Sequence, residues 1–153
     1  MSENMKPMNS VYLKHRNRGV TLIELMIALV IMAILATVAY PSFLQSVRRG
    51  HRIDAFAALT RTTTNLERFF ATNGTYTTST ALLQLTITGG VAYSDDGHYV
   101  MAVAAGPSGI GSSYVVTATA TAGDTQADDV GCTVFSIDSV GRRVPNPSAS
   151  TCW

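Results

Sequence analysis

The feature that most constrains this chain is an apolar run from Val20 to Tyr40 that contains a single acid near its start. Within the run only Thr21, Glu24 and Thr37 carry polar side chains. A membrane-spanning helix needs about 20 apolar residues, so the run predicts a transmembrane helix. An ionised carboxylate in hydrocarbon costs roughly 2.5–3.5 kcal/mol. Glu24 therefore requires either a cationic partner or a place near the membrane edge, where its side chain can reach water.

The residues that lead into the run resemble a known signal. They read GVTLIELM from Gly19 to Met26, and this string is similar to the class III signal of type IV pilins and pseudopilins. The resemblance implies that a prepilin peptidase cuts after Gly19 and that Val20, the new N-terminal residue, is N-methylated. It also implies that Glu24 pairs with the N-terminal amine of a neighbouring subunit. Val20 departs from the phenylalanine usual at this position, where the family tolerates other apolar residues.

Charge is distributed unevenly along the sequence. The first 19 residues are net positive, with four basic residues against one acid (Lys6, Lys14, Arg16 and Arg18 against Glu3). Positive charge before a span favours keeping that end in the cytoplasm, although three arginines follow the run and compete with it (Arg48, Arg49 and Arg52). The remainder of the chain has more acids than bases. Such a head domain gives no electrostatic case for strong nucleic-acid binding.

A helical pattern continues beyond the apolar run. Residues recur at mostly three- and four-residue steps up to a terminating Asn73-Gly74 pair (Val47, Ile53, Phe56, Leu59, Thr63, Leu66 and Phe70), which predicts an amphipathic helix. Pro41 and Gly50 weaken the helix, and the resemblance implies a bend there. One helix over 20–72 would be about 80 Å long. Its first half must therefore pack in lipid or among other helices.

Strand patterns follow the helix. Residues 73–97 have no sustained period, although a short strand or helical turn is expected near Leu82–Ile87. Alternation then predicts strands over 98–104, 113–121, 132–138 and 142–144. A helix followed by a run of antiparallel strands indicates an α+β fold. We expect a long, bent N-terminal helix packed on a C-terminal antiparallel β-sheet, which is the pilin fold to which the resemblance points.

Two cysteines, Cys132 and Cys152, stand near the C-terminus without a metal-binding pattern around them. An even count in an exported domain favours one disulfide, and two free buried thiols are the alternative. The segment from Cys132 to Cys152-Trp153 resembles the disulfide-closed region of pilins. It is more similar to PilE-type minor pilins of the type IVa class than to major pilins.

We find no constellation for catalysis, no phosphate-binding loop and no Cys/His set with metal-ligand spacing. The histidines (His15, His51 and His98) stand in different segments and are interpreted as solvated. The acids Asp124, Asp128 and Asp129 are interpreted as a solvated loop rather than a calcium site. Arg142-Arg143 is interpreted as a solvated turn, with DNA binding as a minor alternative. We therefore predict no enzyme activity, no metal and no cofactor.

The sequence thus predicts a structural subunit of a type IV pilus, most similar to a minor pilin. We expect a leader at 1–19, a transmembrane and assembly segment at 20–44, and a head at 45–153. The head comprises a helix at 45–72, an αβ loop at 73–97 and a sheet with its disulfide region at 98–153. The expected partners are other pilin subunits, the prepilin peptidase, the inner-membrane assembly platform and, before assembly, the membrane. The alternatives are a type II secretion pseudopilin and an uncleaved, membrane-anchored binding or adhesion module with its head in the periplasm.

Overall fold

The computed structural model describes residues 19–145 and 151–153. The chain divides into two units, Met1–Ala39 and Tyr40–Trp153, and each is treated by itself. One helix, α1 (Leu22–Asn73), contributes residues to both units. The predicted leader lies outside the described residues except for Gly19.

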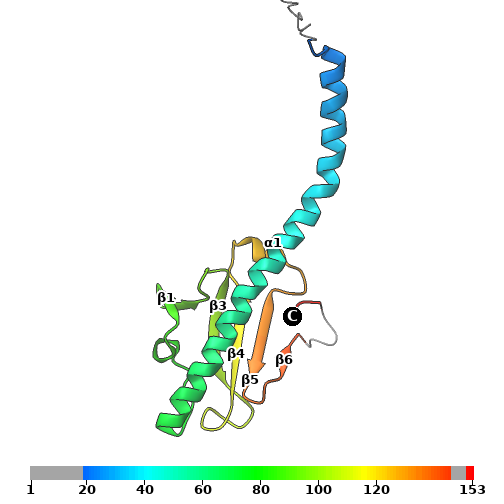
Figure 1. The fold of residues 1–153 in the computed structure, drawn as a ribbon. Helices are drawn as coiled ribbons and strands as arrows, with labels where there is room; N and C mark the ends of the chain where they lie inside the picture. Colours follow the sequence, from blue (N-terminus) through cyan, green and yellow to red (C-terminus); the bar gives the residue numbers. More distant parts are fainter. Residues whose placement is uncertain (1–18, 146–150) are drawn as a thin grey trace, which may run out of the picture. The chain divides into compact units, whose positions relative to one another are not determined.

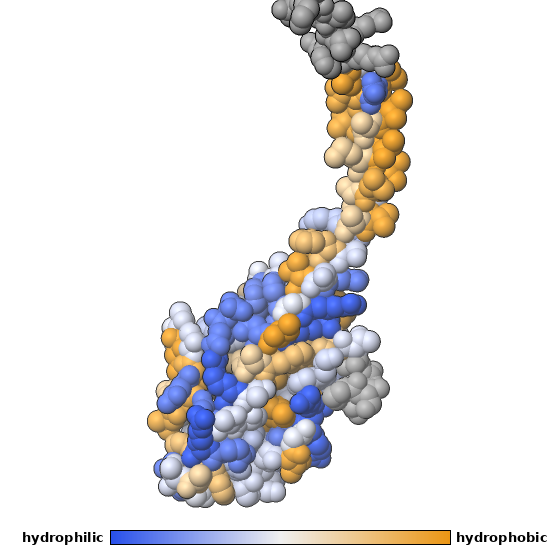
Figure 2. Space-filling model, viewed as in Figure 1, coloured by the Kyte–Doolittle hydropathy of each residue, from blue (hydrophilic) through white to orange (hydrophobic). Residues whose placement is uncertain are grey.

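In the first unit, α1 carries apolar side chains that have no protein to pack against. Every described residue up to Ala39 is exposed, and Figure 2 shows this stretch as almost continuously hydrophobic. A helix that is apolar all round is stable only inside a membrane or surrounded by other apolar surfaces. Its length and composition fit a membrane span, in agreement with the expectation from the sequence.

The second unit is an antiparallel sheet with the remainder of α1 across one face (Figure 1). The six strands lie in chain order. They are β1 (Thr86–Thr88), β2 (Val91–Tyr93), β3 (Tyr99–Ala105), β4 (Tyr114–Ala120), β5 (Val134–Asp138) and β6 (Arg143–Val144). Two short 3-10 helices, η1 (Thr80–Leu83) and η2 (Thr125–Asp128), interrupt the loops before β1 and before β5. The α+β pilin fold predicted from the sequence is confirmed.

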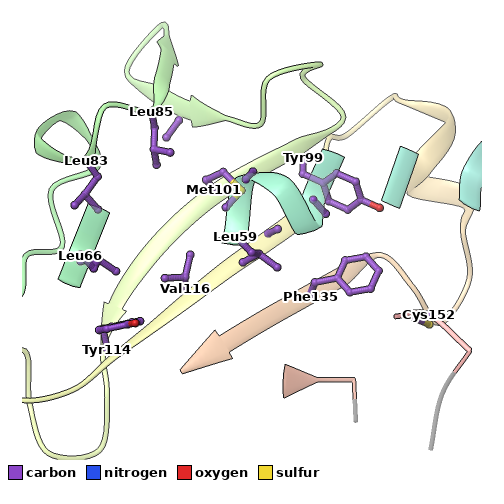
Figure 3. Close-up of a cluster of buried hydrophobic side chains, with 14 of the residues drawn as sticks. Leu59, Leu66, Leu83, Leu85, Tyr99, Met101, Tyr114, Val116, Phe135 and Cys152 are labelled. Atoms are coloured by element: carbon purple, nitrogen blue, oxygen red, sulfur yellow. The ribbon is translucent and has the colours of Figure 1, made fainter. Parts of the chain in front are cut away.

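The core lies between α1 and alternate residues of the three central strands (Figure 3). Strand side chains alternate between the two faces of a sheet, and Tyr99, Met101 and Val116 point toward the helix side. Ala118 is the Cα partner of both Met101 on β3 and Phe135 on β5. Leu59 and Leu66 of α1 complete the fully buried layer.

The buried face of α1 differs from the one predicted. Its buried residues are largely small or polar (Asp54, Ala55, Ala58, Leu59, Thr62 and Leu66). Ile53, which the apolar pattern placed on the packed face, is 67% exposed, so that prediction was wrong. Small side chains at 55 and 58 let the helix approach the sheet closely. Large apolar residues therefore do not mark the contact face by themselves.

The segment predicted as an αβ loop contains more structure than expected. It holds η1 and the hairpin of β1 and β2, in which Ile87 pairs with Ala92. The hairpin turns at Gly89 and Gly90, whose φ angles of 59° and 82° are in the left-handed region that favours glycine. Three-residue strands are too short to show an alternating period. The four strands that were predicted are present, with ends that differ by one or two residues.

The C-terminus closes onto the sheet and helix. Cys132 and Cys152 form the predicted disulfide. Trp153 stacks on Phe56 of α1 with ring centroids 4.7 Å apart, and its ring meets Phe135 of β5 edge-on. The disulfide and the stacked ring together fix the last residues of the chain beside the start of β5.

Candidate functional site

Gly19 and Val20, where cleavage and the start of the assembly segment are predicted, lie immediately before α1. Thr21 caps the helix, since Glu24 N donates to Thr21 Oγ1 at 3.2 Å, while Thr21 N donates to Glu24 Oε2 at 3.5 Å. This reciprocal arrangement is a capping box. Val20 and Glu24 are both exposed in the single chain. The Glu24 carboxylate therefore has a local structural role, and it is also accessible to another subunit.

The predicted weak points lie within a continuous helix. Pro41 is inside α1, where it removes one backbone hydrogen bond. A Cβ added at Gly50 would meet no atom within 4 Å. Packing in the described part of the chain therefore does not require glycine at position 50. A role for Pro41 and Gly50 in bending during assembly stays a prediction.

A cationic and aromatic surface lies where α1 meets the C-terminal residues. Two adjoining hollows, of about 330 and 440 Å³, share Arg49, Arg52 and Thr151 in their linings. The first also includes Arg48, and the second includes Trp153. We give the name arginine edge to Arg48 and Arg49 together with Trp153 and the guanidinium of Arg143, which lies over the Trp153 ring.

The arginines of this region differ in how strongly they are already paired. Arg52 is engaged by the Asp129 carboxylate and the Thr151 carbonyl, and the Arg48 guanidinium is 3.7 Å from the exposed Asp128 carboxylate. Within residues 19–145 and 151–153, Arg49 has no ion pair. Arg143 lies over the Trp153 ring at 5.0 Å in a cation–π contact, and it has no ion pair among residues 19–145 and 151–153. Arg49 and Arg143 are therefore the cations best placed to bind an anionic partner.

The acids near the arginine edge are mostly paired with arginines inside the head. Arg142, predicted to be solvated, is largely exposed but bonds to Asp138 at 2.7 Å. Burial raises the pKa of the Asp129 carboxyl, but hydrogen bonds and positive charge from Arg52 outweigh it and the pKa falls below its usual value. Asp129 is buried rather than solvated, so the prediction of a uniformly solvated acidic loop was wrong. The formally negative head thus retains locally available positive charge.

Two histidines predicted to be separate and solvated lie in contact. The rings of His51 on α1 and His98 before β3 stack with centroids 3.7 Å apart. His98 Nδ1 is 2.9 Å from Asp124 Oδ2. Sequence reasoning missed this cluster, although His51 stands at helical steps of four and seven before the buried Ala55 and Ala58. That spacing places His51 on the sheet-facing side of α1.

An apolar N-terminal helix, a head with a meander sheet and a C-terminal disulfide define a type IV pilin. Residues 14–40 match the prokaryotic N-terminal methylation motif. Residues 41–136 match a family described as "Type IV minor pilin ComP, DNA uptake sequence receptor". The chain belongs to this minor pilin family.

A curated relative agrees with this assignment. "Fimbrial protein EcpC" of Eikenella corrodens is 32% identical over 107 residues, which cover 70% of this chain and 65% of the relative. The chain therefore spans less than two thirds of the relative that it matches. The predicted type IV pilus subunit is confirmed by the family and motif matches together, and the apolar N-terminal helix fits an inner-membrane anchor that precedes assembly into an extracellular pilus.

Proposed function

We propose that this minor pilin binds duplex DNA through the arginine edge while it is part of a pilus. The observation that carries the proposal is the pairing state of the arginines: Arg49 has no ion pair within the described residues, and Arg143 is held over Trp153. Arginine side chains bind phosphate oxygens, and exposed cations supply most of the sequence-independent affinity for DNA. The family description, a DNA uptake sequence receptor, supports the same function.

This proposal differs from the expectation that the negative head lacks an electrostatic case for DNA. The net charge of the head counts acids that are already paired with arginines in the fold. DNA binding instead depends on the local charge of the surface that contacts the DNA. Asp129 is held by Arg52, and Asp95 is held by Arg61. Asp128 is exposed beside Arg48, and its negative charge will reduce the attraction of that arginine for phosphate. We therefore assign the main phosphate contacts to Arg49 and Arg143.

The test is fluorescence anisotropy with a labelled duplex and the full chain in detergent, over a range of salt concentrations. The Arg49→Ala, Arg143→Ala double variant is expected to weaken binding about tenfold and to lower the salt slope by about 2, or about 1 for each phosphate that no longer has an arginine partner. Arg68→Ala removes the same kind of charge from an exposed position near the other end of the head helix. It should leave both quantities unchanged.

Unchanged affinity in the double variant, or an equal loss in Arg68→Ala, would reject the arginine edge as the DNA site. The Arg142→Ala, Arg143→Ala variant tests whether the Arg142-Arg143 turn contributes to DNA binding beyond the arginine edge. Arg142 is already bonded to Asp138, so this variant should lose only the Arg143 contribution.

We also propose that maturation follows the family's course. The peptidase removes residues 1–19, the amine of Val20 is methylated, and the assembly platform moves the subunit from lipid into the filament. The segment 20–44 then packs among other pilin helices while 45–153 forms the head. We propose no catalytic activity, in keeping with the structural role of the family.

Intact mass spectrometry on sheared surface filaments tests maturation. A species that begins at methyl-Val20, at a low ratio to a more abundant pilin, is the expected result. A chain that begins at Met1 and stays in the membrane fraction would instead support the uncleaved anchored module.

A further inference from the structure

The stacked histidines and their neighbouring acid form a cluster with potential metal ligands. His51, His98 and Asp124 each place one ligand atom so that all three lie within 4.8 Å of one another. His51 lies in α1, His98 immediately precedes β3, and Asp124 immediately precedes η2. All three are partly buried, so an ion there would be shielded but reachable from solvent.

Asp124 is fixed in a suitable orientation. Its Oδ1 accepts hydrogen bonds from Gln126 N at 2.8 Å and from Thr125 Oγ1 at 3.3 Å. This leaves Oδ2 directed at His98. Asp124 Oδ2 is therefore the carboxylate oxygen available to an ion beside His98.

The backbone at His98 is held by the fold, whereas the His51 ring has an unpartnered nitrogen. Thr121 N donates to the His98 carbonyl at 2.9 Å, and Thr121 Oγ1 donates to the Gly97 carbonyl at 2.8 Å. His51 Nδ1 is buried and has no hydrogen-bond partner among residues 19–145 and 151–153. A buried polar atom without a partner is costly. Metal coordination by the His51 ring would give this side chain a polar interaction that the protein alone does not provide.

We propose that His51, His98 and Asp124 bind one divalent transition-metal ion of the zinc type. Imidazole nitrogen with carboxylate oxygen is a donor set for zinc and its neighbours in the first transition series, whereas calcium and magnesium prefer oxygen alone. Three protein ligands leave a fourth tetrahedral position for water. Both cysteines are held in the disulfide, so thiolate does not compete for the ion.

The distances allow such an ion with small side-chain adjustments. Zinc lies about 2.0–2.1 Å from imidazole nitrogen and about 2.0–2.2 Å from carboxylate oxygen. The 2.9 Å between His98 Nδ1 and Asp124 Oδ2 thus corresponds to an N–Zn–O angle of about 90°, and an increase of this distance by about 0.5 Å gives a tetrahedral angle. The ion would take the place of the direct contact between these two atoms. Rotation of the His51 ring out of its stack would then bring in the third ligand.

An ion at this position would join α1 to the loops on either side of β3 and β4. It would sit on the head, close in sequence to the Arg52–Asp129 contact. The expected consequence is a more stable attachment of the helix to the sheet. This inference does not depend on DNA binding, because none of the three ligands belongs to the arginine edge.

The experiment uses the full chain, purified in detergent without a polyhistidine tag and treated with EDTA. Equilibrium dialysis against Zn²⁺ with metal analysis should give one bound ion per chain and a raised melting temperature. His51→Gln, His98→Gln and Asp124→Asn should each weaken binding by at least about tenfold. Replacement of Zn²⁺ by Co²⁺ should give the visible absorption of a tetrahedral cobalt site, which His51→Gln abolishes.

Two control variants test the assignment. His15→Gln removes the remaining histidine of the sequence, and Asp128→Asn removes an exposed acid from the same loop as Asp124. Both variants should bind Zn²⁺ as tightly as the unmodified chain does. His51→Gln breaks no hydrogen bond at Nδ1, so the circular dichroism of this variant should be unchanged. A loss of metal binding in this variant would then report a lost ligand and not a lost fold. Less than half an ion per chain, or full binding by His51→Gln, would overturn the proposal and leave His98 and Asp124 as a hydrogen-bonded pair without a metal.

Discussion

Arg52 and Asp129 form a two-point ion pair between α1 and the loop that precedes β5. Arg52 Nε is 2.8 Å from Asp129 Oδ2, and Arg52 Nη2 is 2.9 Å from Oδ1. The third nitrogen, Nη1, donates to the Thr151 carbonyl at 3.0 Å. Gln126 Nε2 also donates to Asp129 Oδ2 at 2.7 Å. One guanidinium therefore connects the head helix, the η2 segment and the C-terminal residues.

The first prediction concerns the stability that this pair supplies. The two side chains are only 12% and 10% exposed, and removal of one partner of a buried pair leaves an uncompensated charge. Arg52→Ala should lower the free energy of unfolding by about 3 kcal/mol. The measurement is chemical denaturation of the full chain in detergent, followed by near-UV circular dichroism.

The control is another bidentate pair on the same helix. Arg61 and Asp95 are as close, at 2.7 Å, but are 38% and 52% exposed. Solvent screens such pairs, so Arg61→Ala should cost about 1 kcal/mol or less. Equal losses of unfolding free energy in Arg52→Ala and Arg61→Ala would show that burial does not decide how much an ion pair contributes to stability.

The second prediction is a loss of stability in acid. The pKa of Asp129 is below its usual value in the folded chain, as is the pKa of Asp124. The unfolded chain therefore binds protons before the folded chain does. The stabilisation is complete above the unfolded pKa of about 3.9 and is lost as pH falls through the lower folded value. The melting temperature should fall steeply below about pH 4.

Asp129→Asn tests the origin of this pH dependence. The variant cannot titrate at position 129, so it should start from a lower melting temperature at pH 7 and decline less between pH 5 and 3. A decline as steep as that of the unmodified chain would assign the acid sensitivity to other carboxyls. Asp128→Asn serves as the control, because the Asp128 side chain is 77% exposed.

The fold was predictable where the sequence carries a long period or a specific motif. The apolar run to Tyr40 and the alternation around Val116 each extend over enough residues to define an element. The pairing of Cys132 with Cys152 needed only an exported context and an even count. The short strand or helical turn expected near Leu82–Ile87 is present as η1 and β1. The pairing of β1 with β2 was not predicted, because strands of three residues have no measurable period and only Gly89-Gly90 marked the turn.

The contacts between elements were not predictable in the same way. Arg52 and Asp129 are 77 residues apart, and each alone has the character of a solvated charge. The same holds for His51 and His98, whose stacking depends on how α1 crosses the sheet. Periodicity shows which side of an element is buried, but it does not identify the residue that will lie opposite. The buried Ala55 and Ala58 illustrate a second limit, since small residues carry little apolar signal.

The third prediction concerns the connection between β3 and β4. A Cβ at Gly106 would lie 2.6 Å from Ser113 Oγ, 2.8 Å from Ser113 Cβ and 3.0 Å from Tyr114 N. Ser113 Oγ is itself held, since Ser108 N donates to it at 2.9 Å. Gly106→Ala should therefore destabilise the head by about 1–3 kcal/mol through overpacking.

Gly111 in the same connection provides a matched control. A Cβ there meets nothing within 4 Å, so Gly111→Ala should change the melting temperature little. Thermal unfolding of the two variants side by side gives the comparison. Equal stability of both would mean that the loop relaxes around residue 106 at no cost.

The fourth prediction separates two roles of Glu24. Its carboxylate belongs to a capping box with Thr21, and the family resemblance pairs the same group with the amine of a neighbouring subunit. Glu24→Gln distinguishes these roles, because glutamine also serves in a capping box but carries no charge. Glu24→Val removes both interactions.

If the charge directs assembly, Glu24→Gln and Glu24→Val should both enter the membrane and be cleaved normally, yet be incorporated into filaments at least about tenfold less. A tenfold change needs only about 1.4 kcal/mol, which is well within the cost of leaving a partner's amine unpaired in an apolar bundle. Immunoblots of sheared filaments and of membrane fractions measure the two steps separately. Normal incorporation of Glu24→Gln together with failure of Glu24→Val would assign Glu24 to helix capping. Normal incorporation of both would remove Glu24 from assembly altogether.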